Sequence, residues 1–174
     1  MRAVRLCAWP LALLLTGCGV GASGVQPVEG SPPAVTVAAR QYWATDDDHL
    51  RGVVPAKEPA QPGTADAVRS LLTGLNGAVS AANLFTRLPP LPEGGGTPRV
   101  DVLASPAGQL TVVLPYDVRR LDKLAVGQVV CTAWSAEAAR RDSLAQIPVR
   151  LTGDGDHARG PYRCDDFPTD AQTP

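Results

Sequence analysis

The sequence has few of the residues from which enzymes build active sites. It contains only two histidines, His49 and His157, and no serine lies in the Gly-x-Ser-x-Gly pattern of many hydrolase nucleophiles. A Ser-His-Asp mechanism would need one of these histidines beside a serine. No two cysteines have the C-x-x-C spacing of a zinc or redox site. We therefore predict a protein without catalytic activity and without a cofactor.

Positive charge is also limited. The chain has 16 basic and 17 acidic side chains, which give a net charge of −1. Its lysines are Lys57 and Lys123, and the other basic residues are arginines. The basic residues form no patch in the sequence, so nucleic acid is not an expected partner. The chain has no internal repeat of the solenoid type.

The N-terminus carries the strongest signal in the sequence. Arg2 and Arg5 precede an apolar run, residues 6–15, which is about half as long as the roughly 20 residues of a membrane-spanning helix. The run leads into Leu15-Thr16-Gly17-Cys18, which resembles the lipobox of bacterial lipoprotein precursors. The resemblance implies that residues 1–17 are a signal peptide and that Cys18 carries acyl chains. It also implies an extracytoplasmic protein anchored to the cell membrane.

Cleavage at this position would remove 17 of the 174 residues and leave 157, enough for one ordinary domain. Removal of Arg2 and Arg5 leaves 14 basic and 17 acidic side chains, a net charge near −3. Residues 18–34 are rich in Gly, Pro and Ser and have no apolar periodicity, so they are predicted to be a flexible tether.

The remaining cysteines are predicted to form a disulfide bond. Cys7 lies in the segment that cleavage removes, and a lipid on Cys18 leaves Cys131 and Cys164 as an even pair in an oxidising compartment. Their bond would close a loop of about 34 residues and stabilise the fold by roughly 3–4 kcal/mol. The alternative, a reactive thiol or metal ligand, would need partner residues nearby, and neither cysteine has them in the sequence.

The first half of the domain is predicted to contain a hairpin and a helix. Alternation from Val35 to Trp43 is typical of a half-buried strand, and residues 50–54 favour a second strand, with residues 46–49 as an acidic tip. Thr64 is the expected N-cap of a helix that ends at Gly74 or Gly77. The apolar face of this helix would comprise Val68, Leu71, Leu72 and Leu75.

The second half repeats this order with clearer patterns. Residues 100–102 and 110–114 alternate as two strands joined by a turn at Ser105–Gly108. A helix is expected from about Leu121, and Gly127 within it would mark close packing. Residues 147–151 favour a last strand. The order β-β-α-β-β-α-β predicts an α+β fold, a single domain in which two helices cover one face of an antiparallel or mixed sheet.

Several strings of this pattern resemble the GerMN domain family, which is named from sporulation and germination proteins and also occurs in lipoproteins of high-GC Gram-positive bacteria. The matching strings are residues 67–74 (AVRSLLTG), 84–89 (LFTRLP), 110–114 (LTVVL), 128–132 (QVVCT) and 149–155 (VRLTGDG). The chain departs from the family in two places: no proline follows Gly74 closely, and Cys131 replaces an apolar or aromatic residue. The resemblance implies an extracytoplasmic binding or assembly module over residues 35–155, followed by a polar tail, 156–174, and it supplies no catalytic residues.

A metal site is the main alternative to such a module. Asp46, Asp48 and His49 offer carboxylate and imidazole ligands. Against this, consecutive residues of a strand point to opposite faces, so a solvated hairpin tip is the expected structure. Residues 154–157 (DGDH) begin like a calcium loop but lack its later ligands, and a turn is the expected structure there too.

Other side chains suggest contact surfaces. Tyr116 could lie at a sheet edge to which a partner strand adds, and the loop at residues 89–98 could contact a partner. Trp43 and Trp134 are expected to pack in the core or on the disulfide. The sequence thus predicts a non-catalytic, lipid-anchored binding or scaffolding module of the cell envelope, with the membrane and an envelope protein as partners. A solute- or metal-binding lipoprotein is the alternative.

Overall fold

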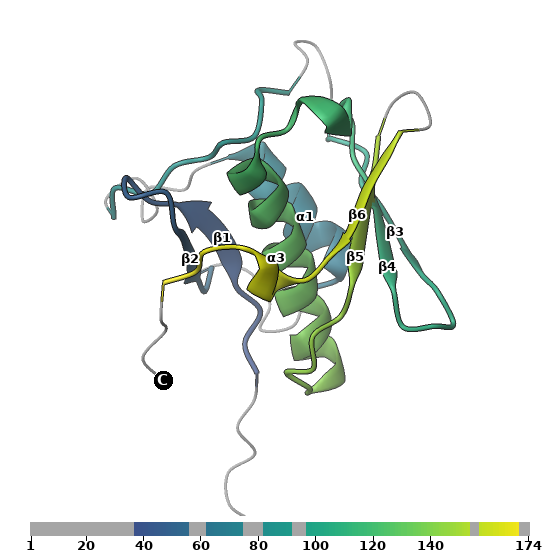
Figure 1. Cartoon of the computed structure of the whole chain (residues 1–174). Coiled ribbons are helices and arrows are strands. Elements are labelled where there is room, and N and C mark those ends of the chain that lie inside the picture. Colours follow the sequence, from purple (N-terminus) through teal and green to yellow (C-terminus); the bar gives the residue numbers. More distant parts are fainter. Residues whose placement is uncertain (1–36, 56–61, 75–81, 92–96, 154–156, 171–174) are drawn as a thin grey trace, which may run out of the picture. The chain divides into compact units, whose positions relative to one another are not determined.

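The structure, a computed structural model, describes residues 37–55, 62–74, 82–91, 97–153 and 157–170 (Figure 1). These residues belong to one compact unit, Val35–Pro174. The predicted signal peptide, Cys18 and the tether lie outside the described residues, as do Leu75, Gly77 and residues 154–156.

Helices and strands follow the predicted order, with one strand added at the end. The elements are β1 (Gln41–Ala44), β2 (Leu50–Val53), α1 (Thr64–Thr73), β3 (Asp101–Ala104), β4 (Leu110–Val113), the 3-10 helix η1 (Val118–Arg120), α3 (Lys123–Arg141), β5 (Val149–Thr152), β6 (Ala158–Tyr162) and the 3-10 helix η2 (Cys164–Asp166). The predicted α+β class is confirmed.

The strands form two sheets, where the sequence suggested one. β1 and β2 pair with each other antiparallel, whereas the second sheet has the order β3-β4-β5-β6. In that sheet β4 and β5 run parallel and the other two pairs run antiparallel. Helix α3 contacts β1 and β2 as well as β5, and α1 contacts α3, β1 and β3. The helices therefore cover one face of the four-stranded sheet, and the β1–β2 hairpin packs on their other side (Figure 1).

Strand β6 lies in the segment that the sequence predicts to be a polar tail, residues 156–174. It pairs antiparallel with β5, with a register irregularity between Val149 and Leu151. Its sequence, ARGPY, has no alternation of apolar and polar residues, so no pattern marked it as a strand. Pro161 is compatible with the strand because β6 is at the edge of the sheet, where one side of the backbone needs no strand partner.

Two local predictions are wrong. Strand β1 begins at Gln41, and all four of its residues are buried because α1, α3 and β2 all contact it, so the half-buried alternation does not apply. The N-cap of α1 is Gly63. Thr64 is instead the first helical residue, and its hydroxyl donates a hydrogen bond to Oε2 of Glu137 at 3.0 Å.

Helix α3 is buried along most of its length, because it has a sheet on each side. Its N-cap is Asp122, whose side chain accepts a hydrogen bond from the backbone N–H of Ala125. A Cβ on Gly127 would lie 2.7 Å from Cδ1 of Leu50 and 2.8 Å from the ring of Phe167. The predicted close packing at Gly127 is therefore present, and its partners are β2 and the segment that follows η2.

Cys131 and Cys164 form the disulfide bond that the sequence predicts. Cys131 lies in the middle of α3 and Cys164 begins η2, and both are buried. The bond joins α3 to η2 and therefore to the C-terminal segment.

Glu137 is a carboxylate buried in the last part of α3. It forms ion pairs with Arg140 and Arg141 and accepts the hydrogen bond of Thr64. Hydrogen bonding from Arg140, followed by Arg141 and Thr64, lowers the pKa of Glu137 from 4.5 to about 2, although burial opposes the shift. This network ties the end of α3 to the start of α1.

We expect Glu137→Gln to destabilise the protein by about 2 kcal/mol at neutral pH, because it removes a charged partner from two arginines and a hydroxyl. A carboxylate whose pKa is lowered in the folded state stabilises it above the unfolded pKa of 4.5. This contribution disappears as the pH falls through about 2. The difference between wild type and variant in denaturant unfolding should therefore shrink between these two pH values.

Thr64→Val is the matched control, since it removes the neutral partner and keeps both arginines. It should retain the acid-dependent loss of stability. An equal pH dependence in wild type and Glu137→Gln would contradict the assignment.

Candidate functional site

The β1–β2 hairpin has the predicted acidic tip. Residues 46–48 form the turn, with Asp48 in the left-handed conformation at φ 60°. The backbone N–H of Thr45 donates to the carbonyl oxygen of His49 at 3.0 Å, and the Thr45 hydroxyl donates to Oδ1 of Asp47 at 2.5 Å. These bonds fold the side chain of Asp47 back toward the hairpin.

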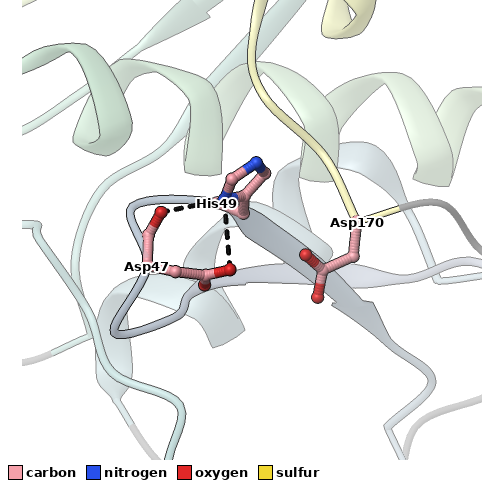
Figure 2. Close-up of side chains that lie close together, drawn as sticks. All are labelled: Asp47, His49 and Asp170. Carbon is pink, nitrogen blue, oxygen red and sulfur yellow. Dashed lines mark hydrogen bonds and ion pairs between the residues drawn. The ribbon is translucent and has the colours of Figure 1, made fainter.

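Three side chains with metal-ligand chemistry gather beside this tip. Asp47, His49 and Asp170 each place one ligand atom within 4.8 Å of the others (Figure 2). Nδ1 of His49 lies 2.8 Å from the carbonyl oxygen of Asp47 and 3.4 Å from its Oδ2. Figure 2 shows the carboxyl groups of Asp47 and Asp170 approaching the same region from two different segments.

Asp170 reaches the tip because the C-terminal segment runs along β2. The backbone N–H of Leu50 donates to the carbonyl oxygen of Pro168 at 2.8 Å, and that of Asp170 donates to the carbonyl oxygen of Leu50 at 2.9 Å. Leu50 and Thr169 thus form a parallel bridge. Arg51 on β2 then pairs with Asp170 through Nε and Oδ2 at 2.7 Å.

The predicted ligand set of Asp46, Asp48 and His49 is not brought together. Asp48 pairs instead with Arg87, through Oδ1 and Nη2 at 2.8 Å, and Asp46 is exposed in the turn. The turn directs neighbouring side chains apart, as the alternation argument anticipated for a strand. His49 is the one predicted residue that belongs to the cluster.

Hydrogen bonding holds the pKa of Asp47 below its ordinary value of 3.8. The Thr45 hydroxyl is the main cause that lowers the pKa of Asp47, with a further contribution from the backbone N–H of Asp47 and smaller ones from His49 and Arg51. The sequence did not predict that Asp47 and Asp170 would lie in this cluster. Asp170 lies far from His49 in the sequence, and the backbone bonds that place it have no side-chain signature.

A second surface feature is a groove of about 330 Å³ at the start of α3. It is lined by Arg87, Pro89, Tyr116, Asp117, Arg120, Leu121 and Asp122. Hydrogen bonding from Arg119 lowers the pKa of Asp117 to about 2. The groove therefore combines permanent charges of both signs with one aromatic ring.

Tyr116 does not lie at a free sheet edge, contrary to the prediction. It follows β4, which has β3 on one side and β5 on the other, so no partner strand can add there. Its ring is buried, and its hydroxyl donates to the carbonyl oxygen of Pro89 at 2.9 Å. Residues 92–96 of the predicted contact loop lie outside the described residues.

Trp43 and Trp134 both contribute to the packing of the main core. Trp43 is completely buried in the main core, which confirms the prediction for this residue. Trp134 is half-buried against the same core, and its Nε1 donates to the carbonyl oxygen of Ala145 at 3.1 Å.

Comparison of the chain with protein-family models, curated proteins and solved structures finds no match. The resemblance to the GerMN family therefore stays a prediction. None of the helices in the described residues has both the length and the apolar character needed to cross a membrane.

Burial raises the pKa of Tyr116 above its ordinary value of 10. The folded protein should therefore show a tyrosine that ionises late when tyrosinate absorbance is followed against pH, and Tyr116→Phe should remove that component. The substitution should also cost about 1 kcal/mol of stability, because it leaves the Pro89 carbonyl without its donor. A tyrosinate titration curve that is unchanged by Tyr116→Phe would contradict the assignment.

Proposed function

We propose that the protein is a lipid-anchored, extracytoplasmic lipoprotein that acts as a non-catalytic binding or scaffolding module of the cell envelope. The observation that carries the proposal is the short apolar run with two preceding arginines, which leads into Leu15-Thr16-Gly17-Cys18. In this proposal Cys18 is the acylated residue.

The disulfide between Cys131 and Cys164 supports an oxidising location. Stable disulfides are rare in the cytoplasm and common in proteins that have been exported. This support is independent of the N-terminal signal, because it comes from two cysteines in the folded domain.

The resemblance to GerMN domains supports a binding or assembly role. The α+β fold agrees with that expectation in class and in the order of its elements up to β5. The groove between residues 87–89 and 116–122 supports a contact role by its chemistry, since it presents arginine and aspartate side chains beside an aromatic ring.

We expect Cys18→Ala to move the protein from the membrane fraction to the soluble extracytoplasmic fraction, because acyl chains on Cys18 are the only anchor proposed and two chains give stable attachment. Labelling with a fatty-acid analogue should be lost in the same variant. Cys7→Ala is the matched control and should keep both the label and the membrane location. Cys18→Ala protein that stays in the membrane fraction and keeps its label would refute the anchor.

The scaffolding role is tested by crosslinking in intact cells. We expect the wild-type protein to capture a defined envelope protein, and the Cys18→Ala form to lose that capture because it no longer lies at the membrane. Arg120→Glu, which reverses a charge in the groove, should weaken the crosslink while the membrane fraction is unchanged. If neither the wild-type protein nor Arg120→Glu captures a specific partner, the scaffolding role is contradicted. The proposed anchor would be unaffected by that result.

A further inference from the structure

We propose that Asp47, His49 and Asp170 bind a divalent transition-metal ion of the zinc type. One imidazole nitrogen and two carboxylate oxygens form a ligand set that suits such an ion, as three-ligand zinc sites illustrate. The site lies in the folded domain, so the proposal does not depend on lipidation or on a partner.

The geometry brings the ligand atoms close to the spacing that an ion requires. Bonds of 2.0–2.2 Å to zinc place tetrahedral ligand atoms roughly 3.5 Å apart, and the three atoms here lie within 4.8 Å of one another. The side chains of Asp47 and His49 are 71% and 42% exposed. They can therefore close the remaining distance of about 1 Å by rotation, without displacing the core.

The backbone holds the two segments of the site together. Leu50 is hydrogen-bonded to both Pro168 and Asp170, so Asp170 stays beside the hairpin tip. The hydrogen bond from the Thr45 hydroxyl keeps the side chain of Asp47 folded back toward the hairpin. The entropy of bringing two distant parts of the chain together is therefore lost on folding and not on ion binding.

His49 faces the site through Nδ1. This nitrogen lies beside the Asp47 carboxylate, whereas Figure 2 shows Nε2 pointing away from both carboxyl groups. A carbonyl oxygen can only accept a hydrogen bond, so Nδ1 carries a proton in its contact with the Asp47 carbonyl. Coordination uses the lone pair of Nδ1, so a bound ion would replace the contact between Nδ1 and the Asp47 carbonyl oxygen.

Arg51 competes with a bound cation for the carboxylate of Asp170. Its Nε donates to Oδ2 of Asp170, which occupies one oxygen of that carboxylate and places a positive charge beside the site. A bound cation must share or displace this contact. The arginine therefore compensates the two carboxylates in the absence of an ion and lowers the affinity of the site.

The test is titration of Zn²⁺ into the tag-free, detergent-solubilised protein, followed by calorimetry and by the midpoint of thermal unfolding. We expect wild-type protein to bind one equivalent and to unfold at a higher temperature with zinc. His49→Gln and Asp170→Asn should each weaken binding by about tenfold or more. Arg51→Gln should strengthen it several-fold, because it removes the competing cation.

His157→Gln and Asp46→Asn are the matched controls, each removing a ligand-type side chain outside the cluster. Both should bind zinc as wild type does. Unfolding of every variant without zinc separates a loss of ligand from a loss of fold. Wild-type protein that binds no zinc, or binding that survives in both His49→Gln and Asp170→Asn, would overturn the proposal. Neither result would bear on the membrane anchor, which the Cys18→Ala variant tests separately.

Discussion

Polar side chains on one row of α3 hold the hairpin side of the fold in place. Gln128, Thr132 and Ser135 follow one another at helical spacing and bond to extended backbone. Ser135 and Thr132 accept the N–H groups of Arg40 and Tyr42, both at 2.9 Å. Gln128 accepts the N–H of Arg87 at 2.7 Å and donates to the carbonyl oxygens of Tyr42 and Phe85. Since a buried backbone group without a partner is costly, this row determines where β1 and residues 85–87 can lie.

The same helix also positions the C-terminal segment. The disulfide from Cys131 holds η2 against α3, and Phe167 packs where Gly127 leaves room. From there the chain continues along β2, where Leu50 bonds to Pro168 and Asp170. The proposed metal site is thus a consequence of packing around α3. The disulfide bond, whose two cysteines are 33 residues apart in sequence, fixes Cys164 beside α3 shortly before Asp170, the third proposed ligand.

The two surface features differ in their chemistry. The cluster of Asp47, His49 and Asp170 has the small, directional ligand set of an ion site. The groove beside Tyr116 is larger and has fixed charges of both signs, as at a protein contact. They are linked through Asp48 and Arg87, because the tip residue pairs with a residue that lines the groove. The proposed ion site and the proposed partner surface are therefore neighbours on one domain.

Patterns that come from one-sided burial were readable in the sequence. The spacing of Val68, Leu71 and Leu72 predicted α1, and the alternation of Leu110 and Val112 predicted β4. The disulfide was predicted in a different way, from the even number of cysteines that remain beside Cys18. By contrast, only the tertiary structure decided the separation into two sheets, the strand β6 and the position of Asp170. These depend on backbone hydrogen bonds between distant segments. Such bonds use groups that almost every residue carries, so they leave no pattern in the order of the side chains.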